Sequence, residues 1–403
     1  MTSRKHADDL RGAAKLAIEG TKGVTRVVED MHRTIASGPR ILGRPLATPV
    51  RALMGLVYGP IRGITDLVGG GIDLVLSQVA PLLGESTPCP ERPERPERDA
   101  LVAALNGVLG DYLEETKNPL AIQMELRSEG LSLSLESDAL RDAIPHASGK
   151  LLVLVHGSSM NDRQWNRLGH DHGAALAKDL GFTPVYLRYN TGLHVSTNGR
   201  AFSGLLEDLV ANWPVPVEEL TLLGHSMGGL VSRSACHIAE VENLRWRTKL
   251  RRLVFLGTPH HGSPLERGGN WVDVLLDISA YSAPLARLGQ IRSAGVTDLR
   301  FGNVRDEDWQ GRGRFARSAD SRTAMALPKD VACFTIAGTT AHPMAERLFG
   351  DGLVPKDSAL GRNERPDLDL AFPEENQWVA TETGHLDLLN RQSVYDKLRE
   401  WLA

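Results

Sequence analysis

Short, almost entirely apolar runs alternate with stretches of helical spacing after residue 150. A strand with apolar residues on both faces must be covered on both faces, as happens in a parallel sheet with helices on either side. The pattern therefore predicts an α/β domain with a mostly parallel, doubly wound sheet. The predicted strands are 151–155, 183–187, 220–223, 253–256 and 331–337.

Further elements are expected around these strands. Leu, Val and Ala recur with helical spacing over 99–116, and residues 123–135 alternate like a strand pair with Glu129-Gly130 as its turn. Near the end of the chain, residues 377–380 predict a last strand and residues 393–402 a closing helix.

Repeated Glu-Arg-Pro over residues 87–99 predicts an extended linker, because proline-rich, charged sequence cannot form a core. It separates an amphipathic helical extension, 1–86, from the α/β domain, 100–403. One interpretation docks the extension on that domain or on a second copy. Another lays it on a membrane or lipid surface. The absence of a dense Lys/Arg face favours docking.

The composition excludes several kinds of protein. A net charge of −4 over 403 residues gives no basic surface for nucleic acid. Cys89, Cys236 and Cys333 are too sparse for a disulfide framework or a zinc site, so we expect no metal and no cofactor. With neither a signal-like apolar segment nor a bilayer-length apolar run, we expect a cytoplasmic location, with membrane association only through the extension.

The sequence Gly224-His225-Ser226-Met227-Gly228-Gly229 follows the strand 220–223 and precedes a helix predicted over 230–240. This is G-x-S-x-G in its strand–turn–helix setting, where the serine sits on a tight, strained turn and its small neighbours provide clearance. The pattern predicts Ser226 as a catalytic nucleophile.

A nucleophilic serine needs a base and an orienting carboxylate, here in the order serine, acid, histidine. His385 follows the last predicted strand, in a loop from which it can reach the serine. Asp351 lies between two glycines after the strand 331–337. Asp357 is its competitor, while Asp387 is too close to His385 in sequence to suit the usual order.

Two backbone N–H groups usually form the oxyanion hole of such a site. One belongs to the residue after the nucleophile, Met227. The other is expected from Ser158, in the loop His156-Gly157-Ser158 after the strand 151–155. His170-Asp171-His172 is interpreted as a helix N-terminus and not as a metal pair, because no further ligand cluster accompanies it.

As a set, these motifs resemble lipase-like bacterial esterases of the α/β-hydrolase superfamily, a group that includes relatives of the GPI inositol-deacylase catalytic domain. The resemblance covers about residues 151–401 and implies carboxylic ester hydrolysis by Ser226, Asp351 and His385. Ser158 departs from the common lipase form, which has an apolar residue there. The motifs are Leu154-Val155-His156-Gly157, the Ser226 motif, Leu256-Gly257-Thr258-Pro259-His260-His261-Gly262, Asp351-Gly352-Leu353-Val354-Pro355 and Gly384-His385.

A long insertion, about 263–330, stands where a simple fold needs one crossover helix. Its apolar and aromatic residues predict a helical lid that shapes an acyl pocket, with Trp271, Leu275 and Tyr281 as substrate contacts. A helix packed permanently on the domain is the alternative.

The predicted function is an esterase or lipase that acts through an acyl-enzyme on apolar esters, with a small-molecule or lipid-like ester, or even a polyester, as substrate. An acyltransferase with the same three residues is one alternative. A non-catalytic binding protein of the same fold is another. The oligomeric state stays open.

Overall fold

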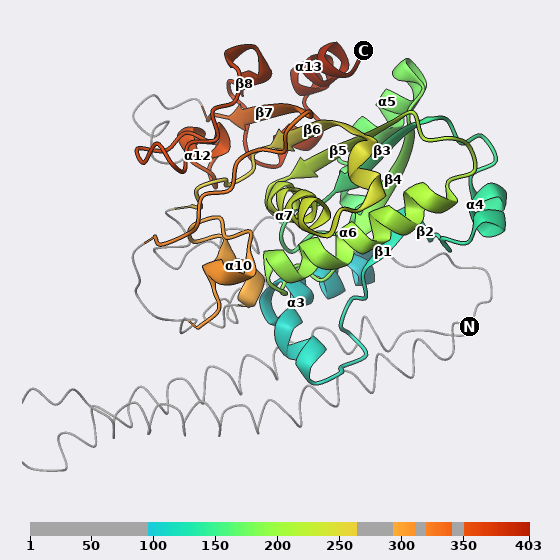
Figure 1. Cartoon of the computed structure of the whole chain (residues 1–403), viewed down its shortest axis with the longest axis horizontal. Helices are drawn as coiled ribbons and strands as arrows, with labels where there is room; N and C mark the ends of the chain where they lie inside the picture. The colour runs from blue at the N-terminus through green and yellow to red at the C-terminus, as the bar shows by residue number, and fades with distance from the viewer. Residues whose placement is uncertain (1–95, 264–292, 312–319, 341–349) are drawn as a thin grey trace, which may run out of the picture.

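The computed structural model describes residues 96–263, 293–311, 320–340 and 350–403 (Figure 1). The predicted N-terminal extension and most of the predicted linker lie outside the described residues. So do the predicted substrate contacts Trp271, Leu275 and Tyr281. Within the described residues, no helix is both long and apolar enough to cross a lipid bilayer.

The described residues form one sheet with the strand order β2-β1-β4-β3-β5-β6-β7-β8. In this order, all neighbouring strands from β4 through β3 to β8 pair in parallel. β1 pairs antiparallel with β4 and forms an antiparallel hairpin with β2. The strands are β1 (Glu125–Ser128), β2 (Leu131–Ser132), β3 (Lys150–Val155), β4 (Thr183–Arg188), β5 (Glu219–His225), β6 (Leu250–Leu256), β7 (Ala332–Gly338) and β8 (Gln377–Ala380).

Helices cover both faces of this sheet. Alternate residues of β3 divide between two cores: Leu151 and Val153 belong to the core with α3, α6 and α7, and Leu152 and Leu154 to the core with α5 and α13. Figure 1 shows α6 and α7 in front of the strands. The helices are α3 (Pro96–Glu115), α4 (Ser137–Ala143), α5 (His172–Leu180), α6 (Val195–Asn212), α7 (Met227–Glu242), α10 (Ala294–Asp298), α12 (Lys356–Ala359) and α13 (Gln392–Leu402).

The fold predicted from the apolar runs is confirmed: this is the mostly parallel, doubly wound sheet of the α/β-hydrolase fold. Each predicted strand is present, and Glu129-Gly130 forms the turn of the β1–β2 hairpin with positive φ at both residues. The first described helix, α3, begins at Pro96, inside the segment predicted as linker. Proline suits the first turn of a helix because the N–H that it lacks would have no intrahelical acceptor.

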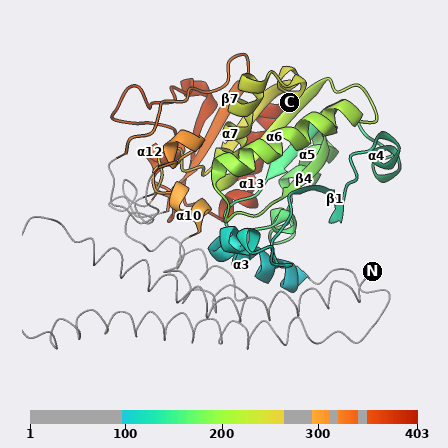
Figure 2. The ribbon, with the colours of Figure 1, turned by 60° about the horizontal axis from the view of Figure 1, so that its bottom comes forward.

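The part of the predicted lid insertion that begins at Ser293 and continues into α10 packs against α3. Ser293 Oγ donates a hydrogen bond to the carbonyl oxygen of Gly107 at 2.6 Å, and the N–H of Ala294 donates to Asp111 Oδ2 at 3.0 Å. Figure 2 shows α10 beside α3 in a second view. This part of the insertion is therefore anchored to the domain, and the lid itself stays a prediction.

The parallel register aligns the carboxyl ends of the central strands. Val155 of β3 pairs with Gly224 of β5, and His225 pairs with Leu256 of β6. The same edge continues through the pairs of β6 with β7 and of β7 with β8. The loops that follow these strands therefore meet at one edge of the sheet, where ligands bind in folds of this class.

A buried cluster of charged side chains holds the start of α3 against β1 and β4. Asp99 Oδ1 lies 3.1 Å from Arg188 Nη2, and Asp99 Oδ2 lies 3.3 Å from Arg163 Nε. Asp162 Oδ2 lies 3.1 Å from Arg127 Nε. Burial raises the pKa of Asp162, and the neighbouring Arg127 and Arg188 oppose that rise. The cluster attaches α3 to the sheet. Each buried charge in it depends on its partners, because removing one would leave another unpaired in the interior.

We expect Asp99→Asn to lower the free energy of unfolding by about 3–5 kcal/mol, because it leaves buried Arg188 without its nearer carboxylate. Chemical denaturation measures this change. Asp138→Asn is the matched control: Asp138 pairs with Arg141 at the surface, and we expect less than about 1 kcal/mol from its loss. Equal effects of the two substitutions would contradict a structural role for the cluster.

Candidate active site

Ser226 stands between the end of β5 and the start of α7, in the predicted strand–turn–helix setting. Its backbone has φ 53° and ψ −124°, a sparsely populated conformation that costs about 1–3 kcal/mol for a residue with a side chain. The N–H of Ser226 donates to the carbonyl oxygen of Leu256 at 2.8 Å, which ties the turn to β6. A Cβ at Gly228 would lie 2.2 Å from the carbonyl oxygen of Val155, so the clearance predicted for this glycine is required.

The Ser226 side chain is buried, with 2% of its surface exposed. Its Oγ makes no hydrogen bond to any of the described residues. The turn places it at the N-terminus of α7, where the first helical N–H groups have no intrahelical acceptor and the helix dipole is positive. The surroundings therefore favour negative charge beside this hydroxyl.

Asp351 and His385 form a buried pair across 34 residues of sequence. The Nδ1–H of His385 donates to Asp351 Oδ2 at 2.7 Å, and the N–H of His385 donates to the backbone carbonyl of Asp351 at 3.0 Å. Asp351 Oδ1 accepts the N–H groups of Leu353 and Val354 at 3.0 and 2.8 Å. The carboxylate is therefore fixed by its own turn, and the imidazole proton is directed to Nδ1, which makes Nε2 the basic nitrogen.

The two competing aspartates take other positions. Asp387 Oδ2 accepts the N–H of Gly384 at 3.1 Å and closes the turn that carries His385. Asp357 lies in α12, where its carbonyl oxygen accepts the N–H of Arg362. Asp351 is thus the one of the three whose carboxylate hydrogen-bonds to the imidazole.

Gly257, directly after β6, lies against the Asp351–His385 pair. Its φ is +56°, and a Cβ there would lie 2.9 Å from Asp351 Oδ2 and 3.2 Å from His385 Cε1. Only glycine leaves room for this approach. Gly257 is part of the Leu256–Gly262 motif, and no pattern in the sequence indicates its contact with Asp351 and His385.

His225, next to Ser226, is a site residue that the sequence analysis missed. Its Nε2–H donates to the backbone carbonyl of His385 at 3.0 Å, and the two rings lie 4.7 Å apart. Burial, and then the nearby His385, hold the pKa of His225 well below its usual value, so the ring is neutral. The serine turn and the histidine loop are therefore joined by one hydrogen bond.

His172 holds the same loop from α5. Its Nε2–H donates to the carbonyl oxygen of Leu388 at 2.9 Å, and its Nδ1 lies 2.9 Å from His170 Nε2. Asp171 caps α5 by accepting the N–H of Ala174, so the helix N-terminus predicted here is confirmed. In the part of the chain that the structure describes, no cluster of three or more side chains could hold a metal ion.

The loop after β3 lies directly against the serine turn. A Cβ at Gly157 would lie 3.0 Å from Ser226 Cβ. Tyr189 Oη donates to the carbonyl oxygen of His156 at 2.8 Å, and burial lowers the pKa of His156 to about 3. The structure thus brings Gly157, the neighbour of Ser158, against Ser226, and Met227 follows Ser226 as the first residue of α7. The role of Ser158 and Met227 as an oxyanion hole stays a prediction.

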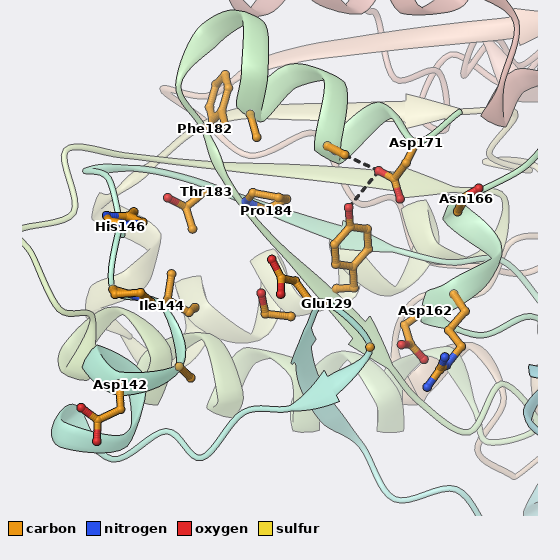
Figure 3. Close-up of a pocket in the computed structure, with 18 of the residues that line it drawn as sticks. Glu129, Asp142, Ile144, His146, Asp162, Asn166, Asp171, Phe182, Thr183 and Pro184 are labelled. Atoms are coloured by element: carbon orange, nitrogen blue, oxygen red, sulfur yellow. Dashed lines mark hydrogen bonds between the residues drawn. The ribbon is translucent and has the colours of Figure 1, made fainter. Parts of the chain in front are cut away.

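A separate cavity of about 1120 Å³ lies beside α5 and the first half of β4 (Figure 3). Asp171, which lines this cavity, caps α5 and also accepts a hydrogen bond from the hydroxyl of Tyr186 at 2.8 Å. None of the predicted site residues that the structure describes lines this cavity, and we assign it no catalytic function. The residues labelled in Figure 3 include Glu129, Asp142, Ile144, His146, Asp162, Asn166, Phe182, Thr183 and Pro184.

Comparison with known proteins agrees with this fold. Residues 146–329 match the family model of the PGAP1-like alpha/beta domain, as the sequence motifs predicted. That range holds the serine turn and the loop after β3, and Asp351 and His385 lie beyond its end. No curated protein matches the chain in sequence.

Three solved structures illustrate the structural similarity. Mature lipase BlEst2 of Bacillus licheniformis is 18% identical, covers 63% of this chain and 92% of its own, and has a TM-score of 0.42. Lipase 1 of Pelosinus fermentans is 13% identical over 64% of this chain and 99% of its own, with a TM-score of 0.37. Esterase PF2001 of Pyrococcus furiosus is 14% identical over 64% and 82%, with a TM-score of 0.39.

The pKa of His172 predicts how stability changes with pH. Burial lowers this pKa from 6.5 to about 4, so the unfolded chain takes up the proton first as the pH falls. The contribution of His172 is therefore complete above about pH 6.5 and is lost on the way down to about pH 4, at no more than about 1.4 kcal/mol per pH unit. Glutamine can donate to Leu388 without titrating, so His172→Gln should reduce the slope of the unfolding free energy between pH 6.5 and 5. An unchanged slope in urea titrations would contradict this assignment.

Proposed function

Because residues 146–329 match the family model of the PGAP1-like alpha/beta domain, we propose that this chain is a serine hydrolase that cleaves carboxylic esters through an acyl-enzyme on Ser226. The observation that carries the proposal is the 2.7 Å hydrogen bond between Asp351 and His385, at the sheet edge where the strained Ser226 turn lies. A serine, an orienting carboxylate and a histidine, in this chain order, are the combination that ester hydrolysis on this fold requires.

In the proposed reaction, His385 Nε2 takes the proton of Ser226 Oγ as Oγ bonds to the ester carbonyl carbon. The N–H groups of Ser158 and Met227 stabilise the negative charge that develops on the carbonyl oxygen. The intermediate collapses, the alkoxide leaves with the proton held by His385, and the acyl group stays on Ser226. Water then repeats both steps, releasing the carboxylic acid and restoring the hydroxyl. Asp351 stabilises the imidazolium that forms each time.

We propose an apolar or lipid-like acyl group as substrate, with Trp271, Leu275 and Tyr281 of the insertion as its contacts. Their apolar and aromatic character supports this proposal. Acyl transfer differs only in the final step, where an alcohol replaces water. Product analysis in the presence of an added alcohol separates the two reactions, and p-nitrophenyl esters of increasing chain length locate the acyl preference.

The triad is tested by labelling and by turnover. We expect a fluorophosphonate probe to label the wild-type protein and to leave Ser226→Ala unlabelled. Asp351→Asn should lower kcat on a p-nitrophenyl ester by about 10³- to 10⁴-fold, because an amide no longer orients the imidazole or stabilises its charge. Asp357→Asn is the matched control and should keep kcat within about twofold. Catalysis by Ser226 would be refuted if the wild-type protein were not labelled, or if Ser226→Ala were labelled as strongly as wild type. If Asp351→Asn were as active as Asp357→Asn, Asp351 would not be part of the triad.

His225 is expected to act by positioning His385. His225→Leu removes the donor to the His385 carbonyl, and we expect kcat to fall by about 10- to 100-fold with little change in KM. His225→Gln places an amide N–H near the position of Nε2 and should recover most of the loss. Steady-state kinetics on both variants, with thermal melts to confirm folding, make the comparison. Equal losses in the two variants would show that the hydrogen bond is not what matters.

A further inference from the structure

The hydroxyl of Ser158 is buried and makes no hydrogen bond to any of the described residues. Its residue is 1% exposed, and Oγ has no partner within hydrogen-bonding distance. Burying a hydroxyl without a partner is unfavourable, since the group has given up its hydrogen bonds to water. Such groups are uncommon in folded proteins, and each one calls for a physical explanation.

The place of this hydroxyl suggests the explanation. Ser158 follows Gly157, whose missing Cβ would lie 3.0 Å from both Ser226 Cβ and His225 Nδ1. The Oγ of Ser226 also lacks a hydrogen-bond partner among the described residues. Two unpaired hydroxyls thus lie on adjoining turns at the edge of the sheet, where the proposed substrate carbonyl would bind. The acceptor for Ser158 would arrive with the substrate.

We propose that the hydroxyl of Ser158 is a third donor to the oxyanion, in addition to the N–H groups of Ser158 and Met227; this inference rests on the proposed ester hydrolysis at Ser226. The hydroxyl rotates about its Cα–Cβ bond, so it can turn to an oxygen that becomes negatively charged as Ser226 attacks. An apolar residue at this position would supply the backbone N–H alone. Serine supplies that N–H and a second donor from one residue.

The effect of such a donor falls on the chemical step. A hydrogen bond to an oxygen whose charge develops only in the transition state raises kcat and leaves ground-state binding nearly unchanged. Removing the hydroxyl should therefore lower kcat and leave KM close to its wild-type value. A hydroxyl that serves only the folding of the loop would behave differently, because its loss would lower stability and activity together.

Ser158→Ala separates these two roles and has a matched control in Ser234→Ala. Ser234 lies in α7, is equally buried, and its Oγ is likewise unpartnered among the described residues. It faces α6, where a Cβ at Gly199 would lie 2.3 Å from Ser234 Oγ, and it has no part in the proposed site. Both variants lose one unsatisfied buried hydroxyl and keep their backbone N–H, so they differ only in the position of that hydroxyl.

The experiment measures kcat and KM on a p-nitrophenyl ester and the melting temperature of the full chain. We expect Ser158→Ala to lose about 10- to 100-fold in kcat, with unchanged KM and a melting temperature equal to or above that of wild type. Ser234→Ala should keep wild-type kcat with a melting temperature that is likewise not lowered. Ser158→Cys keeps a side chain of the same shape and slightly larger size, but its thiol is a weak donor, so it should lose kcat as alanine does.

The possible results distinguish failure of the third donor from failure of the proposed ester hydrolysis at Ser226. If wild type neither turns over an ester nor reacts with a fluorophosphonate, ester hydrolysis at Ser226 is wrong. If wild type does both and Ser158→Ala keeps full kcat, only the third donor is wrong. A joint fall in kcat and melting temperature for Ser158→Ala, absent in Ser234→Ala, would assign the hydroxyl a structural role and overturn the inference.

Discussion

The site depends on the backbone hydrogen bonds that keep the parallel strands in register. Because Val155 pairs with Gly224 and His225 with Leu256, the turns after β3, β5 and β6 begin at the same level of the sheet. The backbones of these turns therefore approach the site closely: Gly157 lies against Ser226, and Gly257 lies against Asp351 and His385. A shift of one residue between two strands would also reverse which side chains face each core, so the two buried faces maintain the register on which the site relies.

Neutral histidines then connect the loops that the register brings together. His225 and His172 donate from Nε2 to main-chain carbonyls of the loop that carries His385, one from the serine turn and one from α5. Burial lowers the pKa of both rings. A neutral imidazole with its proton fixed on Nε2 is a directional donor without a charge. The loop is thus held from two sides by uncharged donors, which do not compete with His385 for the Asp351 carboxylate.

Local pattern explains which features the sequence could predict. The apolar runs specify strands, and the glycines around Ser226 specify a tight turn, since both depend on neighbouring residues. Asp351 could be selected because its glycines allow an unusual turn. By contrast, the hydrogen bonds of His225 and His172 span 160 and 216 residues, and no local pattern encodes such a partner. The start of α3 was missed because proline-rich composition predicts a linker, while the buried ion pairs of Asp99 support a helix there.

Several energetically unfavourable features lie together at the carboxyl edge of the sheet. Ser226 has a strained backbone, and the hydroxyls of Ser226 and Ser158 are buried without partners among the described residues. A relaxed turn or a paired hydroxyl would be more stable, but under the proposed function either would have to be broken before a substrate oxygen could be bound. Because these groups are already unpaired in the folded protein, their unfavourable free energy lowers the stability of the fold. The apolar burial in the two large cores on either side of the sheet can offset this loss. The stability that the two cores provide therefore allows the strained turn and the unpaired hydroxyls to persist in the folded protein.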